Sequence, residues 1–171
     1  MIKPHPLTLF LIKIAGIYAI WQLLYELVLL PDGRLDEWLS FMGVSLAHGL
    51  LSFFNFSIES SGRFIAMIGH SGVEILNGCN GLELIGLYAG FIIAYPGKAL
   101  YRIYFLSIGF FLLFISNIFR IALFVLTNGY YPEIWDQVHT YSSYIFFYPI
   151  VLSFWYLWTT MSEETDIFSP S

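Results

Sequence analysis

The chain has 171 residues, of which 58% are hydrophobic and only 11% are charged, and its net charge is −5. A water-soluble domain has roughly 45–50% apolar and about 25% charged residues, so this composition excludes an ordinary soluble domain and predicts an integral membrane protein. The negative charge argues against a nucleic-acid partner, which would favour a basic surface, and the single cysteine excludes an internal disulfide.

The apolar runs predict one membrane domain over residues 1–171, with no internal repeat or long linker. A spanning helix needs about 20 mostly apolar residues. The predicted fold class is an all-α integral membrane protein with about four transmembrane helices, an outer interfacial helix and a small β-prone extracytoplasmic stretch. The segments are a first span at 7–30, the interfacial helix at 36–56, outer strands at 57–78, further spans at 80–96, 99–127 and 138–160, and a cytoplasmic tail at 161–171.

The segment at 36–56 allows two interpretations. It is long enough to cross a membrane, and a fifth span would change the side on which the C-terminus lies. However, Ser45, His48, Ser52 and Asn55 recur at spacings of three and four, which gives a helix one narrow polar stripe. This pattern favours a helix that lies along the outer membrane surface.

The basic residues predict the orientation of the spans. Short cytoplasmic loops carry an excess of Lys and Arg. Lys3 precedes the first span, and Lys98 and Arg102 flank the turn between the second and third spans. With four spans, these residues place both termini inside and residues 31–79 outside. Arg34 and Arg63 then fall outside, against the trend.

Three chemically active side chains are predicted to meet at the outer surface. Cys79 precedes the second span and therefore lies at its outer end. Arg120 lies about 20 residues into the third span, which at about 1.5 Å per residue returns it across the hydrocarbon layer of about 30 Å. His139 opens the fourth span at the same level. Cys79, Arg120 and His139 should therefore converge.

Each of these residues also has an ordinary structural interpretation. A lone cysteine is commonly a small buried apolar group, and a charged side chain near a helix end commonly extends to the interface. Arg120, however, has apolar neighbours on both sides, and an ionisable residue inside a span is costly and marks function. Asn117, three residues earlier on the same helical face, is predicted to orient its guanidinium.

The residues that follow the cysteine predict a helix start. With Asn80 as the N-cap, Glu83 falls at the third helical position, which makes a capping box. Cys79 would then lie at the positive end of the helix, where its thiolate form is favoured.

Three motifs together resemble the exosortase/archaeosortase family. They are CNGLELIGL (Cys79–Leu87), SNIFRIALF (Ser116–Phe124) and VHTYSSYIFF (Val138–Phe147), and the resemblance covers roughly residues 35–160. The short length is similar to that of compact bacterial exosortases, with the F subtype as our interpretation. Asn80 departs from the Ser or Ala common at this position in the family.

The resemblance implies a membrane-embedded cysteine transpeptidase or protease that cleaves C-terminal sorting signals. Its partners would be secreted proteins with a C-terminal motif, a transmembrane helix and a basic tail, together with membrane lipid and a glycan or lipid-linked acceptor. Cys79 would be the nucleophile, Arg120 would stabilise the oxyanion and His139 would be the acid and base, with Asn117, Asn80 and Glu83 in support. No cofactor or metal is expected. The implied location is the bacterial inner (cytoplasmic) membrane, as a multi-pass protein with its active site on the outer (periplasmic) side.

Two other functions remain open from the sequence. One is a non-enzymatic membrane transport or assembly subunit that binds an anion or a lipid through Arg120. The other is a membrane peptidase that hydrolyses its substrate without transfer, because water and an amine attack the same thioester.

Overall fold

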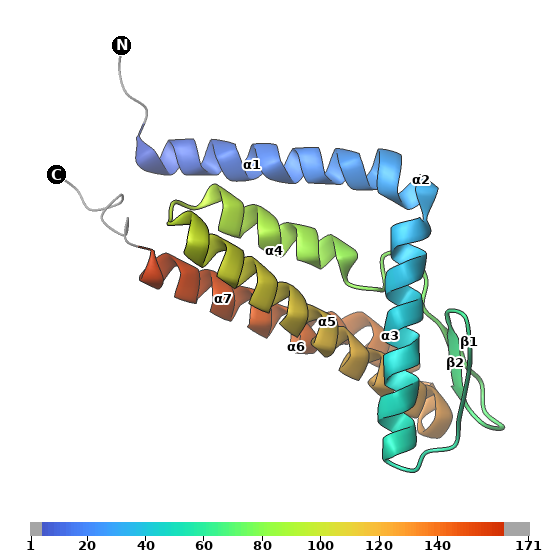
Figure 1. Cartoon of the computed structure of the whole chain (residues 1–171). Helices are drawn as coiled ribbons and strands as arrows, with labels where there is room; N and C mark the ends of the chain where they lie inside the picture. Colours follow the sequence, from blue (N-terminus) through green and yellow to red (C-terminus); the bar gives the residue numbers. More distant parts are fainter. Residues whose placement is uncertain (1–4, 163–171) are drawn as a thin grey trace.

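The computed structural model describes residues 5–162, and most of them are helical. The elements in chain order are α1 (Pro6–Leu24), a π-helical turn η1 (Tyr25–Leu29), α2 (Leu30–Asp32), α3 (Arg34–Phe53), β1 (Ile58–Ser61), β2 (Phe64–Met67), β3 (Val73–Glu74), α4 (Leu82–Ala94), α5 (Ala99–Tyr130), a 3-10 turn η2 (Pro132–Ile134), α6 (Trp135–Phe146) and α7 (Tyr148–Met161). Figure 1 shows α1, α4, α5 and α7 as a bundle of rods that run in a similar direction.

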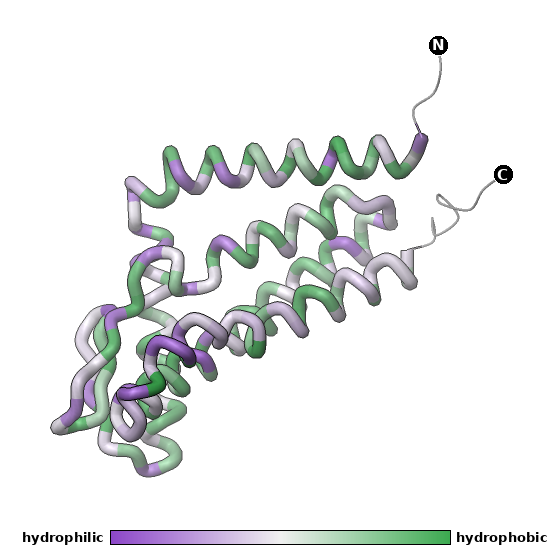
Figure 2. Tube along the Cα trace, turned by 180° about the vertical axis from the view of Figure 1, so that it is seen from behind, coloured by the Kyte–Doolittle hydropathy of each residue, from purple (hydrophilic) through white to green (hydrophobic). Residues whose placement is uncertain are grey.

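The bundle has the dimensions of a membrane domain. Three stretches are long and apolar enough to cross a bilayer, Leu7–Asp32, Ala99–Tyr130 and Pro132–Met161, and α4 adds a shorter apolar helix. Hydrophilic residues are most prominent toward the sheet and the turn between α5 and α6 (Figure 2). The predicted fold class, an all-α membrane protein with a small sheet, is confirmed, while the outer position of the sheet stays a prediction.

The two ends of the bundle differ in structure. The start of α1, the α4–α5 turn and the end of α7 lie together at one end, while α3 and the sheet lie at the other (Figure 1). Gly33 adopts a left-handed conformation with φ 68°, which a glycine reaches without steric cost, and this turns the chain from α2 into α3. Helix α3 runs crosswise to the rods and is not one of the three candidate spans. That it lies along the membrane surface remains our prediction.

The sheet has three antiparallel strands in the order β1-β2-β3. Ile58 pairs with Met67 in β1 and β2, and Ile65 pairs with Val73 in β2 and β3. The buried residues Ile65 and Val73 belong to a core cluster that also contains residues of α3 and of the second half of α5. The sheet therefore fixes the segment that leads from β3 to Cys79.

The last predicted span differs in detail from the structure. Where the sequence predicted one helix over 138–160, the chain forms α6 and then α7, with a break at Phe147. Pro149 lies in the first turn of α7, where its missing N–H needs no helical partner. The tail predicted at 161–171 lies almost entirely outside the described residues.

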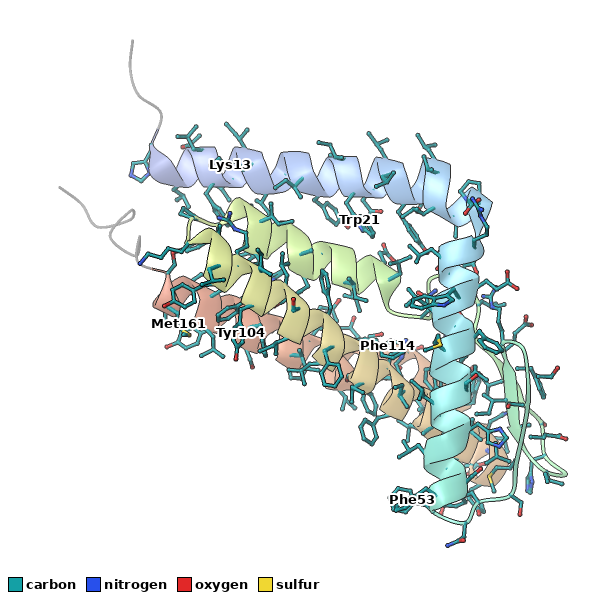
Figure 3. The ribbon with its side chains drawn as sticks, viewed as in Figure 1. Lys13, Trp21, Phe53, Tyr104, Phe114 and Met161 are labelled. Carbon is teal, nitrogen blue, oxygen red and sulfur yellow. The ribbon has the colours of Figure 1, made fainter. Side chains whose placement is uncertain are left out.

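Small residues allow the rods to approach each other closely. A Cβ atom at Gly109 of α5 would overlap Tyr88 of α4, whose hydroxyl donates to the carbonyl of Phe105 at 2.6 Å. A Cβ atom at Gly86 of α4 would overlap Trp21, which lies on the side of α1 that faces α4 (Figure 3). Helix α4, and with it the loop at its start, is therefore held between α1 and α5.

The arrangement predicts that the two ends of the bundle label from opposite sides of the membrane. In a Cys79→Ala background, an impermeant maleimide should label Glu59→Cys in β1 on intact spheroplasts, because the basic α4–α5 turn should be cytoplasmic. It should label Lys98→Cys in that turn only after permeabilisation. Gel shift measures the labelling, and access to both cysteines from one side would contradict this topology.

Candidate active site

The structure brings Cys79, Arg120 and His139 together from three different elements. Cys79 lies in the loop before α4, Arg120 lies on α5 and His139 lies on α6. The Sγ atom of Cys79 is 4.0 Å from Nε2 of His139, and Nη1 of Arg120 donates to the carbonyl oxygen of Cys79 at 3.1 Å. A thiol, an imidazole and a guanidinium therefore share one site at the sheet end of the bundle.

The cysteine lies on a tight turn between two glycines. Gly78 and Gly81 have φ values of 81° and 84°, and a side chain at either position would strain the backbone. The amide N–H of Cys79 donates to the carbonyl of Leu76 at 3.0 Å, which closes the turn. The thiol is thereby presented at the start of α4, half-buried and directed toward α6.

Arg120 is buried, with 6% of its surface exposed. Its Nε donates to Oγ of Ser142 at 2.9 Å, and its guanidinium carbon lies 4.8 Å from the ring centre of Phe124 and 5.3 Å from that of Phe147. Within residues 5–162, no carboxylate lies within 4.0 Å of its nitrogens. The guanidinium is thus held by neutral groups and keeps its positive charge available to the site.

His139 is positioned by aromatic side chains. Its ring stacks on Trp135 with 5.6 Å between centroids and lies 5.5 Å from the ring of Phe124. Its carbonyl accepts from the hydroxyl of Ser142 at 3.0 Å, and this hydroxyl also accepts from Arg120. Ser142 therefore connects the histidine and the arginine. It lies three residues after His139, so helical spacing could have identified it.

A buried carboxylate, which the sequence did not reveal as part of the site, supports the cysteine loop. Asp36 is fully buried, and its Oδ1 accepts from Nδ2 of Asn80 at 2.7 Å, from the hydroxyl of Tyr25 at 3.2 Å and from the amide of Gly78 at 3.4 Å. Asp36 thus contacts the residues on both sides of Cys79. Asp36 lies in the first turn of α3. An acidic residue at that position is already explained by the positive end of the helix dipole, so the sequence did not indicate a further role.

Asn117 occupies the site but has a different partner from the predicted one. It is buried to 1% exposure, and its Nδ2 donates to the carbonyl oxygen of Asn80 at 3.1 Å rather than orienting Arg120. The prediction about its partner was wrong, because the loop of Cys79 folds over this face of α5. Asn117 instead ties that loop to α5.

The predicted capping box is also wrong. The N-cap of α4 is Gly81, which moves Glu83 to the second helical position, and the side chain of Asn80 accepts from the amide of Leu82 at 3.0 Å. Asn80 therefore stabilises the turn before the helix. The carboxylate of Glu83 accepts from Nε2 of Gln22 on α1 at 3.3 Å.

A cavity of about 300 Å³ adjoins this site. Its walls include Gly78 and Gly81 on either side of the cysteine, Arg120 on α5, Glu83 on α4 and Phe147 between α6 and α7. The cavity thus offers space for a ligand beside Arg120 and the loop that carries Cys79, although Cys79 and His139 are not among its wall residues. Within the described part of the chain, no group of three or more His, Cys, Asp or Glu side chains could hold a metal ion.

The comparison with known families agrees with the motifs. A family model for transmembrane exosortases matches residues 6–156, a range that contains Cys79, Arg120 and His139. No curated protein and no solved structure matched the chain significantly. The resemblance is confirmed at the level of the family, while the F subtype stays a prediction. Since the match covers most of its length, the chain belongs to the transmembrane exosortase family.

Proposed function

We propose that this protein is a cysteine transpeptidase or protease that removes C-terminal sorting signals from secreted proteins and transfers the new C-terminus to a surface acceptor. The observation that carries the proposal is the 4.0 Å separation of the Cys79 thiol and the His139 imidazole beside the buried Arg120. A nucleophile next to a base and a cation is the arrangement that acyl transfer requires.

In the first step, His139 takes the proton of the Cys79 thiol, and the sulfur attacks the carbonyl carbon of the scissile peptide bond. A C–S bond forms and the carbonyl oxygen becomes an oxyanion. The C–N bond then breaks while His139 returns the proton to the leaving nitrogen. The products of this step are a thioester on Cys79 and an amine that carries the C-terminal tail.

Arg120 would stabilise the oxyanion. Its Nη1 already lies 3.1 Å from the backbone carbonyl oxygen of Cys79, so the guanidinium is next to the nucleophile before a substrate binds. Its bond to Ser142 and its contacts with two aromatic rings fix its position. A preorganised donor in a site with little water stabilises developing charge strongly.

In the second step, His139 would deprotonate the nucleophile that attacks the thioester. An amine on a glycan or lipid-linked acceptor would give transfer, and water would give hydrolysis. His139 is exposed at the sheet end of the bundle, which supports access from the aqueous side. We place this end on the outer (periplasmic) side of the bacterial inner membrane, in keeping with the basic α4–α5 turn at the other end.

A second candidate function rests on Arg120 alone. Its guanidinium has no carboxylate partner among residues 5–162 and lines the cavity, which would suit an anion or a lipid headgroup in a transport or assembly subunit. In that case the Cys79 thiol would have no role. A Cys79→Ala variant would then keep its function while an Arg120→Ala variant would lose it.

Tail removal should depend on Cys79. When a secreted protein with a C-terminal motif, transmembrane helix and basic tail from the source genome is co-expressed, the wild type should remove its tail, and Cys79→Ala should leave it intact because no thioester can form. Intact-mass analysis of the secreted protein measures the loss, and any added mass identifies the acceptor. Equal processing by both proteins would refute the mechanism.

The rate of tail removal should also depend on the guanidinium of Arg120. Arg120→Lys should lower the rate of tail removal about 10²- to 10³-fold, because an ammonium cannot donate to Ser142 and the oxyanion in one fixed plane. Ser142→Ala should lower it by about tenfold through the loss of one hydrogen bond to a charged group. Arg34→Lys, an exposed arginine paired with Asp32, is the control and should keep full activity. A fully active Arg120→Lys variant would exclude the proposed role.

A further inference from the structure

The cavity beside the Cys79 loop is lined by one carboxylate, Glu83, which the mechanism above does not use. It lies in the first turn of α4, and the cavity wall also includes Tyr18 of α1 and residues of the α6–α7 junction. Arg120 lines the same cavity, yet no Arg120 nitrogen is within 4.0 Å of a Glu83 oxygen. The cavity therefore has a positive group and a negative group that do not neutralise each other directly.

The carboxylate of Glu83 is held in place by neutral partners. Its Oε1 accepts from Nε2 of Gln22 at 3.3 Å, and Gln22 also donates to the hydroxyl of Tyr18 at 2.7 Å. Throughout residues 5–162, no lysine, arginine or histidine nitrogen is within 4.0 Å of it. Gln22 thus fixes the direction of the carboxylate without compensating its charge.

Glu83 is exposed and lies at the sheet end of the bundle, at the start of the apolar helix α4. Tyr18 and Gln22 lie within the candidate span Leu7–Asp32, and the cavity wall continues along α4 with Leu84 and Leu87. An exposed carboxylate beside an apolar wall is open to a ligand in the cavity. A cation or several N–H donors that enter along α4 would complement its charge.

We propose that Glu83 binds the amine side of the scissile bond, at the point where the substrate enters the membrane. This proposal rests on the proposed function. The first N–H groups of the substrate's transmembrane helix have no partner within that helix, and the bilayer offers them none. The start of the substrate's helix also carries a partial positive charge. A carboxylate at the mouth of the cavity satisfies these groups before cleavage.

The same carboxylate receives the product of the first step. Cleavage of the peptide bond turns the leaving nitrogen into a primary amine, which takes up a proton and becomes an ammonium group. Arg120 would face the oxyanion and Glu83 the ammonium, and both residues line the cavity. The two charges of the cavity thus match the two charges that the reaction generates, and Glu83 is a substrate-binding residue.

Peptide binding to the Cys79→Ala protein tests this proposal without any cleavage. The probes are two synthetic peptides with the sequence of the released tail, as identified by mass analysis, one with a free N-terminal amine and one N-acetylated. In nanodiscs, the free amine should bind about tenfold more tightly, as expected for a hydrogen-bonded charge pair. Adding Glu83→Gln, which keeps the size of the side chain, should reduce this preference to less than twofold.

The matched control is Glu26→Gln, which removes an exposed carboxylate on η1 outside the cavity. It should keep the full preference for the free amine, and the thermal stability of all variants should be equal. An unchanged preference in Glu83→Gln, or no preference in the parent protein, would overturn the proposal. Either result leaves Cys79-dependent tail removal untouched, whereas tail removal by Cys79→Ala would refute the proposed function itself.

Discussion

The buried carboxylate of Asp36 is the constraint on which the geometry of the site depends. It joins the start of α3 to the loop before α4 through Asn80 and Gly78, and it binds the hydroxyl of Tyr25 at the end of the first span. A fully buried carboxylate is costly unless such donors surround it. The loop of Cys79 supplies two of the three donors to Oδ1, while Oδ2 has no partner among the described residues. These bonds hold the loop against α3, with the thiol facing α6.

The position of this loop determines the positions of two charges at the sheet end of the bundle. The fixed loop presents its carbonyl oxygen to Arg120, and α4 begins just after it with Glu83 directed toward Gln22 of α1. Neither charge has an ionic partner among the described residues, so both are free to interact with a substrate. The cavity that both residues line also has the apolar side chains of Leu84 and Leu87 on α4 in its wall. A cavity with both charged and apolar walls suits a peptide bond at the place where the substrate chain enters the bilayer.

Much of this arrangement could be predicted because helix geometry is fixed. Composition established the membrane class, and the rise per residue of a helix placed Arg120 at the level of Cys79 and His139. Contacts between distant segments could not be predicted. The role of Asp36 depends on a partner 44 residues away, and Asn117 binds the Asn80 carbonyl because the loop folds onto α5. The left-handed Gly81 moved the start of α4 by one residue and so removed the predicted capping box.

The most direct test of the central claim is to look for the thioester on Cys79. The purified enzyme in nanodiscs is mixed with an equal amount of the tailed substrate, quenched in acid during the first turnover, digested and examined by mass spectrometry. The account predicts that the peptide containing Cys79 carries the new C-terminus of the substrate and that hydroxylamine removes it. Release of one equivalent of tail while Cys79 remains a free thiol throughout would contradict it.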